Sequence, residues 1–208
     1  MKSLCLLLLL AGAALAQPVS FGLKAGWPLT DSLDVVQGAT TAANGPHLIG
    51  PEVEVRLPLG LSVEFDALYR HFSYTNFEQF TGTTVTTTGS SGNWEFPLVA
   101  KYRFRTGRIR PYVEAGVAWD ALAGLQNTSG TTYCSIRVCE GANYPPTPFS
   151  QTTAGVVIGG GGDIRLLKLF HIAPEFRFTR WAQQYFNLSG FLQSGQNQVE
   201  FLVGFTFL

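Results

Sequence analysis

The sequence lacks a long internal hydrophobic run, although 46% of its 208 residues are hydrophobic. A membrane-spanning helix needs roughly 20 consecutive apolar residues, so no such helix is expected within the chain. Charge is also scarce, since charged residues make up 13%, against about 25% in typical soluble domains. Basic and acidic residues number 14 each, so there is neither a basic surplus for nucleic acid nor an acidic tail. No nucleic-acid partner is expected.

Cysteine and histidine are too few for a metal centre of the usual kind. A structural zinc site needs about four ligands, and the three histidines, His47, His71 and His171, fall in distant segments. Outside the N-terminal segment the cysteines are Cys134 and Cys139. An even pair of cysteines in an exported protein favours a disulfide. We therefore predict a Cys134–Cys139 disulfide, and neither a metal site nor a cofactor.

The first residues have the pattern of a secretion signal. A lysine opens the segment, residues 4–13 are an apolar stretch, and Ala14-Leu15-Ala16 forms a small-residue cleavage site. The apolar stretch is too short for the alternative, an uncleaved anchor helix. We predict a signal peptide at residues 1–16, which takes the remaining cysteine with it, and one mature domain at residues 17–208.

Hydrophobic and charged residues alternate in eight segments of the mature chain. Glu52, Glu54 and Arg56, for example, interleave with proline, valine and leucine. Strand side chains point alternately to opposite faces, so each segment is predicted to be a strand with one apolar and one ionic face. Each segment is near the length of a tilted strand that crosses a bilayer. The eight predicted strands are residues 19–29, 48–57, 61–74, 94–104, 109–120, 152–165, 170–181 and 198–207.

The connections between these segments alternate between short and long. The short ones are residues 58–60, 105–108 and 166–169, and the long ones are 30–47, 75–93, 121–151 and 182–197. The long connections are rich in Thr, Ser, Gly and Asn, as exposed loops are. Such alternation is typical of outer-membrane barrels. We predict an all-β fold, an eight-stranded antiparallel up-and-down transmembrane β-barrel with short periplasmic turns and long extracellular loops.

The ionic faces must point inward if this barrel lies in a membrane. A lysine or arginine on the lipid-facing side costs about 2–4 kcal/mol at mid-membrane. An eight-stranded barrel has room for packed side chains rather than a channel, and buried charges are tolerated only when paired. We therefore predict a closed interior filled by ion pairs. The predicted interior residues are Lys24, Glu52, Glu54, Arg56, Glu64, Asp66, Arg70, Glu95, Lys101, Arg103, Arg110, Glu114, Asp163, Arg165, Glu175, Arg177 and Glu200.

The same alternation is compatible with a soluble lipocalin-like barrel that has its apolar face inside. Glycines occur at strand positions that share the face, or parity, of the charged residues. They favour the membrane barrel, because small residues leave room for long arginines in a confined interior. Aromatic residues near the strand ends, on the apolar face, suit the two membrane interfaces. The glycines are Gly22, Gly26, Gly50, Gly116, Gly155, Gly159, Gly161 and Gly204. The aromatic residues are Trp27, Tyr69, Trp94 and Trp119 at the outer end, and Tyr102, Phe104, Phe205 and Phe207 at the inner end.

Four motifs follow one another along the strands. They are Phe21-Gly22-Leu23-Lys24-Ala25-Gly26, Trp94-Glu95-Phe96-Pro97, Pro174-Glu175-Phe176-Arg177 and the closing Val199-Glu200-Phe201-Leu202-Val203-Gly204-Phe205-Thr206-Phe207. In this ordered set the chain resembles the OmpA/OmpX-like superfamily of small outer-membrane β-barrels of Gram-negative bacteria. The resemblance implies contact with outer-membrane lipids. It also implies that the barrel-assembly machinery reads the closing alternating run during biogenesis.

One enzyme-like pair occurs near the outer end of the third predicted strand. His71 and Ser73 share a face, so the histidine could activate the serine if a carboxylate oriented it, and Glu78 is the nearest candidate. Outer-membrane lipid A deacylases have a similar His-x-Ser, but the match stops at this triplet. We therefore assign no catalytic residues and predict that the protein is not an enzyme.

The long loops are the other place to look for function. The loop at residues 121–151 carries the cysteine pair with tyrosines and prolines, so an extracellular ligand could bind there. We predict a monomeric barrel with a structural or surface-interaction role, such as membrane integrity or adhesion. The alternatives are a lipid-modifying enzyme, a small-solute pore and a soluble ligand-binding barrel.

Overall fold

The computed structural model describes residues 19–30, 33–35, 39–80, 83–104, 107, 109–134, 152–166, 170–183, 187–188 and 192–207. Nearly all of them lie in strands. The strands are β1 (Val19–Pro28), β2 (Leu33–Val35), β3 (Ala39–Arg56), β4 (Leu61–Asp66), β5 (Leu68–Phe80), β6 (Thr83–Arg103), β7 (Ile109–Cys134), β8 (Thr152–Arg165), β9 (Phe170–Trp181), β10 (Asn187–Leu188), β11 (Leu192–Ser194) and β12 (Asn197–Phe207). One 3₁₀ turn, η1 (Pro58–Gly60), joins β3 to β4.

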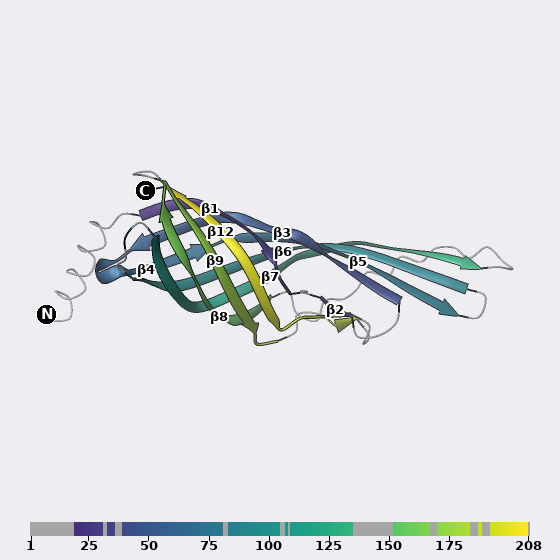
Figure 1. The fold of residues 1–208 in the computed structure, drawn as a ribbon. Coiled ribbons are helices and arrows are strands. Elements are labelled where there is room, and N and C mark those ends of the chain that lie inside the picture. Colours follow the sequence, from purple (N-terminus) through teal and green to yellow (C-terminus); the bar gives the residue numbers. More distant parts are fainter. Residues whose placement is uncertain are drawn as a thin grey trace, which may run out of the picture.

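The main sheet closes on itself to form a barrel (Figure 1). Around the barrel the order is β1, β12, β9, β8, β7, β6, β4 and β3, and β1 pairs with β3 to complete the ring. β5 continues from β4 and takes the same place between β3 and β6. All of these pairs are antiparallel, so the predicted closed, eight-stranded antiparallel barrel is confirmed.

The third strand of the barrel is interrupted at Ala67, between β4 and β5. The Ala67 amide donates a hydrogen bond to the Pro51 carbonyl oxygen over 3.0 Å. A Cβ atom at Gly50 would overlap the backbone carbonyl of Ala67. The glycine at position 50 therefore allows the interrupted strand to approach β3 closely.

The end of the barrel with the short connections is called the inner end here. It includes η1, where Leu59 and Gly60 both have positive φ values, 66° and 85°. The beginning of β1 and the end of β12 lie at the same end, with Phe21 opposite Phe207. An even number of barrel strands places the beginning of the first strand and the end of the last strand on one side.

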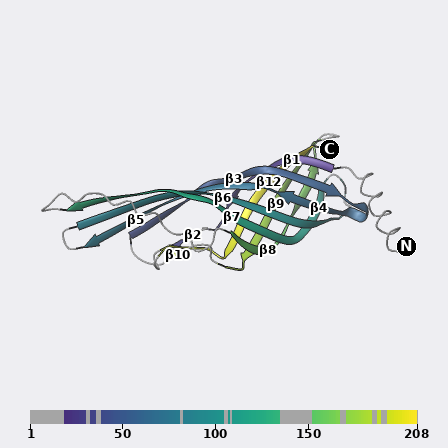
Figure 2. The same cartoon turned by 180° about the vertical axis from the view of Figure 1, so that it is seen from behind.

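At the opposite, outer end, four strands run past the rest of the barrel as a projecting ribbon (Figures 1 and 2). The outer ribbon comprises the outer parts of β3, β5, β6 and β7. β5 and β6 pair as far as Phe80 and Thr83, and β6 pairs with β7 as far as Cys134. The predicted strand ends at residues 48, 74, 94 and 120 were therefore wrong. The sequence 83–88 is rich in threonine, which is polar but favours strands, so polarity alone did not mark a loop.

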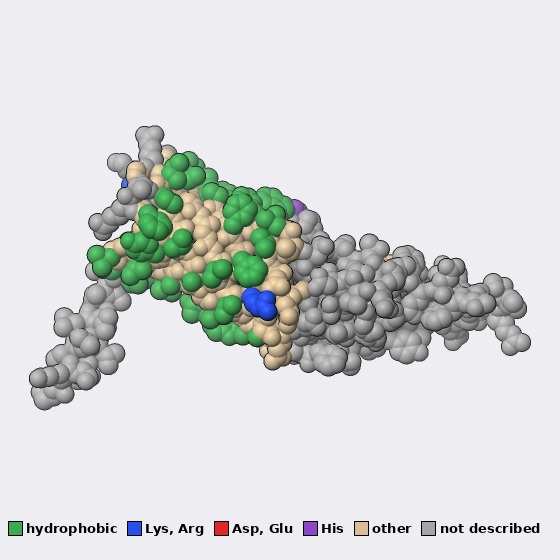
Figure 3. All heavy atoms as spheres, turned by 60° about the horizontal axis from the view of Figure 1, so that its bottom comes forward, with side chains coloured by type: hydrophobic (Ala, Val, Ile, Leu, Met, Phe, Trp, Pro, Cys, Tyr) green, Lys and Arg blue, Asp and Glu red, His purple; other side chains and the backbone are tan. Residues whose placement is uncertain are grey.

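The outer surface of the barrel is apolar. Phe21, Ile158 and Phe176 are about 60% exposed, and hydrophobic side chains are spread over the barrel wall (Figure 3). The soluble lipocalin-like alternative is wrong, because it requires the apolar face inside. The predicted aromatic residues are largely exposed at both rims, as with Trp27 at 47% and Phe207 at 59%. In the described part of the chain, no helix is long and apolar enough to cross a membrane.

Candidate functional site

The barrel interior brings together charged side chains from strands that are not neighbours. Lys24 from β1, Glu64 from β4 and Glu175 from β9 meet there, each at most 2% exposed. Neither β4 nor β9 is hydrogen-bonded to β1. The contacts therefore cross the interior instead of following adjacent strands.

Lys24 lies at the centre of this arrangement. Its ammonium nitrogen is 2.5 Å from Glu64 Oε1, 3.0 Å from Glu175 Oε1, 3.1 Å from Asp66 Oδ2 and 3.3 Å from Glu52 Oε2. All four carboxylates are buried. One lysine thus neutralises charge from three other strands.

Two more cations complete what we call the central cluster. Lys101 Nζ lies 2.7 Å from Glu64 and 3.0 Å from Glu175. Arg177 contacts Glu114 through Nε at 3.1 Å and Glu175 through Nη2 at 2.9 Å. The Tyr112 hydroxyl donates to Glu175 Oε2 over 2.6 Å. The central cluster consists of Lys24, Glu52, Glu64, Asp66, Lys101, Tyr112, Glu114, Glu175 and Arg177.

Two groups of three carboxylates in the central cluster are close enough to hold a metal ion. They are Glu52, Glu64 and Asp66, and Glu64, Glu114 and Glu175, with oxygens within 4.8 Å of one another. Lys24 contacts every member of the first group, and Lys101 contacts every member of the second. The lysines therefore already supply the positive charge that a metal would bring.

Glycines make the space that these long side chains occupy. A Cβ atom at Gly22 would lie 2.6 Å from Glu52 Oε1, and one at Gly204 would lie 2.9 Å from the same oxygen. A Cβ atom at Gly159 would lie 2.6 Å from Glu114 Oε1. Such distances are far shorter than real contacts, so larger residues would displace the carboxylates.

A second group of polar side chains, the outer cluster, surrounds Arg70 nearer the outer end. Arg70 Nη2 lies 3.0 Å from Glu95 Oε2, and Nη1 lies 3.6 Å from Glu200 Oε1. Asn93 donates to Asp120 Oδ2 over 2.7 Å. The outer cluster consists of Arg70, Asn93, Glu95, Asp120, Gln198 and Glu200, all at most 2% exposed.

Apolar side chains also occupy interior positions, so the interior is not wholly polar. One buried group is Leu48, Leu68 and Leu202. The other is Val99, Ala118, Val157 and Trp181. These residues have the same parity as the charged residues of their strands, because alternation fixes the face of a side chain and not its chemistry.

The inner end holds a third group, the inner cluster, in which Arg103 joins two carboxylates. It pairs with Glu54, and its Nε lies 3.3 Å from Asp163 Oδ2. Its Nη1 also donates to Ser62 Oγ over 2.6 Å. The other Asp163 oxygen contacts His171 Nδ1 at 2.6 Å. The inner cluster therefore consists of Glu54, Ser62, Arg103, Asp163 and His171.

Three of the predicted interior residues lie at the inner mouth instead of deep in the barrel. Arg56 and Arg110 are partly buried, and Arg165 is exposed. They stand at or near the ends of β3, β7 and β8, where the interior meets water. The alternation along each strand predicted the face on which these arginines lie, but it carried no information about how deep in the barrel they are.

The interior residues that the sequence prediction missed include an acid, a histidine and a tyrosine. Asp120 is 1% exposed, His171 is 1% exposed and Tyr112 is 2% exposed. Asp120 and Tyr112 share the parity of Glu114 on β7, and His171 shares the parity of Glu175 on β9. The alternation rule, applied to every residue of each strand, would have found all three.

The enzyme-like pair lies on the outward face of β5. His71 is exposed and Ser73 is partly buried, on the same parity as the rim residue Tyr69. No carboxylate among the described residues hydrogen-bonds to His71. The side chain of Glu78 lies outside the described part of the chain. The described residues therefore place His71 and Ser73 on one face of β5, without an acid hydrogen-bonded to the histidine.

Two other predictions fall outside the described residues. Cys134 ends β7, but Cys139 is not described, so the disulfide stays a prediction. The signal peptide at residues 1–16 precedes the first described residue, and it also stays a prediction.

Comparisons with solved structures found similar outer-membrane proteins. The structure is similar to OprG from Pseudomonas aeruginosa, with a TM-score of 0.52 and 11% identity, covering 91% of this chain and 93% of that chain. The N-terminal barrel domain of Pseudomonas aeruginosa OprF gives a TM-score of 0.43 and 16% identity over 92% of this chain and 98% of that one. Neisserial surface protein A gives a TM-score of 0.44 and 14% identity, covering 91% of this chain and 95% of that chain. No curated protein matches the sequence.

The likeness to OprG at this identity supports the fold alone. The sequence itself gives the family, because the family model described as "Outer membrane protein beta-barrel domain" matches residues 3–207. The expected resemblance to small outer-membrane barrels is confirmed. The chain belongs to this family of bacterial outer-membrane β-barrels.

Proposed function

We propose that the protein is a closed outer-membrane barrel with a structural or surface-interaction role, and that it does not form a pore. The observation that carries the proposal is the position of Lys24, which contacts four buried carboxylates from three other strands. Cross-barrel ion pairs of this kind fill the space through which a solute would pass.

The apolar groups in the interior support the same proposal. Leu48, Leu68 and Leu202 form a buried group, and Val99, Val157 and Trp181 belong to another. Hydrophobic constrictions exclude water and ions from narrow pores. A solute would have to disrupt both the ion pairs and these apolar contacts.

Planar-bilayer recording of the purified, folded protein tests this proposal. We expect no stable single-channel conductance, because the paired side chains of the central cluster occupy the barrel interior. A Lys24→Ala variant is a useful comparison, since it removes the central cation and shortens the side chain. Reproducible unitary steps from the wild-type protein, at a frequency that follows protein concentration, would contradict the closed interior.

The outer ribbon supports a role at the cell surface. β5, β6 and β7 extend together well past the barrel (Figure 1). Loops and hairpins carried on a rigid scaffold are common places for binding. In the proposed orientation the inner end faces the periplasm and the outer ribbon faces the medium, where it presents the surface for a partner or for contact with another cell.

A further inference from the structure

We propose that the inner mouth of the barrel is a binding site for a phosphate-type oxyanion, held by Arg56, Arg103 and Arg110. This site is separate from the outer ribbon and does not depend on what the ribbon binds. It lies at the end of the barrel that we place in the periplasm.

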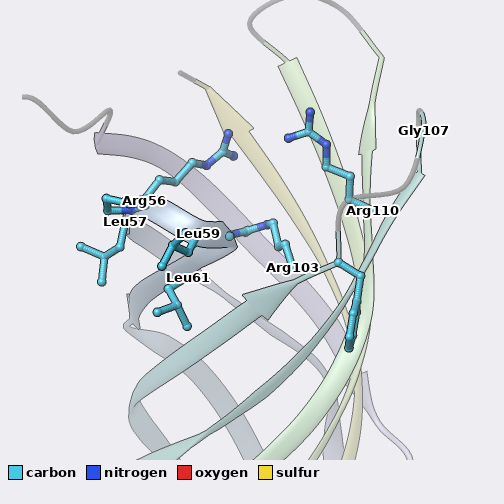
Figure 4. Close-up of a pocket in the computed structure, with 10 residues that line it drawn as sticks. Arg56, Leu57, Leu59, Leu61, Arg103, Gly107 and Arg110 are labelled. Carbon is cyan, nitrogen blue, oxygen red and sulfur yellow. The ribbon is translucent and has the colours of Figure 1, made fainter.

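A cavity of about 560 Å³ opens at this mouth. Its wall includes the three arginines, which come from β3, β6 and β7, together with η1. Figure 4 shows the guanidinium groups pointing toward the space between these strands. The volume lies within the range of about 300–1,000 Å³ that is usual for small-molecule sites.

In the described part of the chain, the inner mouth carries more positive charge than its acids can neutralise. Among the described residues this mouth has four arginines, Arg56, Arg103, Arg110 and Arg165, and the acids that contact any of them are Glu54 and Asp163. Both of those acids are already engaged, Glu54 by Arg103 and Asp163 by His171 and Arg103. The excess positive charge is therefore carried by the arginines that line the cavity.

Arg110 shows this surplus most clearly. Asp163 lies opposite Arg110 in the β7–β8 pairing, yet the Asp163 carboxylate contacts His171 at 2.6 Å instead. Within the described residues, the Arg110 guanidinium has no ion-pair or hydrogen-bond partner. A partly buried guanidinium with free donors is a strong binding group for an incoming anion.

Arg56 provides an independent sign of a missing acceptor. Its only ion pair among the described residues is a 3.6 Å contact with Glu54 Oε2. Its Nε is buried and has no hydrogen-bond acceptor in the described part of the chain. A buried donor without an acceptor is costly, and an oxyanion in the cavity would satisfy it.

Planar guanidinium groups match the geometry of phosphate oxygens and bind them in pairs. The cavity wall also contains Leu57, Leu61 and Phe104, whose side chains are exposed at the membrane edge. An anionic group beside an apolar rim suits a phospholipid headgroup of the inner leaflet. A free phosphate shares the same chemistry, so the experiment has to distinguish these two sources.

NMR of the arginine Nε–H groups provides the test, using the full mature protein in an uncharged, phosphate-free maltoside detergent. One titration uses inorganic phosphate, and a second uses short-chain dihexanoyl-phosphatidylglycerol. Dihexanoylglycerol, which lacks the phosphate, is the control probe. The variants are Arg110→Gln, Arg110→Lys and, as a matched control at the outer end, Arg180→Gln. Heat-dependent gel mobility checks that each variant is folded.

We expect saturable shifts of the Arg56, Arg103 and Arg110 signals with phosphatidylglycerol and none with dihexanoylglycerol. Arg110→Gln should weaken binding by about tenfold or more, as for the loss of one charge-assisted donor. Arg110→Lys should retain part of the affinity, and Arg180→Gln all of it. Comparable saturation by inorganic phosphate would support the site and assign it to a soluble anion.

Three results would overturn the proposal. The first is the absence of saturable shifts with both phosphate-containing probes. The second is an unchanged affinity in Arg110→Gln. The third is an equal loss of affinity in Arg110→Gln and Arg180→Gln, which would mean that the anion binds to positive charge in general and not to this mouth.

Discussion

Lys24 is a single side chain on which the packing of three other strands depends. It is 1% exposed, and its ammonium group lies within 3.3 Å of four carboxylates. Buried ions are tolerated only when their charge is balanced close by. Removing this one cation leaves several acids next to one another with too little positive charge.

Replacing Lys24 with methionine keeps most of the volume and removes the charge. We expect the free energy of unfolding to fall by about 3–5 kcal/mol, the usual cost of breaking a buried ion pair. Urea unfolding in lipid vesicles, followed by tryptophan fluorescence, measures this change. Arg180→Met is the matched control, because Arg180 is exposed and its change should alter stability by less than about 1 kcal/mol.

Adding Glu52→Gln to Lys24→Met removes one of the acids that have lost their partner. The double variant should therefore recover part of the lost stability. A Lys24→Met protein as stable as wild type would show that the central cluster does not need this lysine.

Two glycines of the barrel offer a matched test of interior packing. A Cβ at Gly22 would lie 2.6 Å from Glu52 Oε1, whereas a Cβ at Gly162 would meet nothing nearer than Ile109 Cγ2 at 3.6 Å. We expect Gly22→Ala to destabilise the barrel by about 1–3 kcal/mol through overpacking. Gly162→Ala should leave stability unchanged or raise it by about 0.4–1 kcal/mol. Urea unfolding measures the stability of both variants. Equal changes in the free energy of unfolding at the two positions would refute the packing role of Gly22.

At the scale of the strands, the sequence identified the membrane-crossing parts well and their outer ends poorly. In the crossing part, alternation is enforced by lipid on one side and packed charges on the other. Beyond the barrel both faces of the outer ribbon can be polar, so the alternation fades. β6 and β7 nevertheless keep pairing as far as Thr83 and Cys134, because backbone hydrogen bonds and threonine still favour strands.

The β5–β6 part of the outer ribbon should be separable from the barrel. We expect a variant with residues 72–91 replaced by an Asn-Gly turn to keep its heat-dependent gel mobility, because the central cluster is untouched. It should lose any whole-cell or matrix binding that the wild-type protein confers. Arg165→Gln, at the opposite end, is the control and should bind as wild type does. Undiminished binding by the shortened variant would place the interaction elsewhere.

For the whole molecule, the proposed orientation predicts which end can be reached from outside the cell. In a Cys134→Ser, Cys139→Ser background, we expect Thr86→Cys to react with a membrane-impermeant maleimide on intact cells. Leu59→Cys, in η1 at the inner end, should react only after the outer membrane is permeabilised. Quantitative gel detection of the labelled protein measures both reactions. The reverse pattern would mean that the barrel is inserted in the opposite sense.

Alternation in the sequence was enough to predict the closed barrel and which face of each strand points inward. It could not predict which charges meet. Whether Lys24 contacts Glu175 or Glu95 depends on the stagger of the strands around the ring, which no local pattern records. Nor could alternation predict that Asp163 contacts His171, and that no acid among the described residues pairs with Arg110.

The contact between Lys24 and Glu175 joins residues 151 positions apart in the chain. A partly assembled barrel, with β1, β3 and β4 inserted and β9 not yet in place, would leave the acids around Lys24 without Arg177, which pairs with Glu64 and Asp66, so negative charge would be in excess at the depth of the membrane. Insertion and ring closure must therefore happen nearly together, and unfolding must pass through the same unfavourable state in reverse. Such a barrier slows the loss of the folded barrel whatever its equilibrium free energy. The ion pairs that close the interior thus also make the barrel long-lived once it has formed.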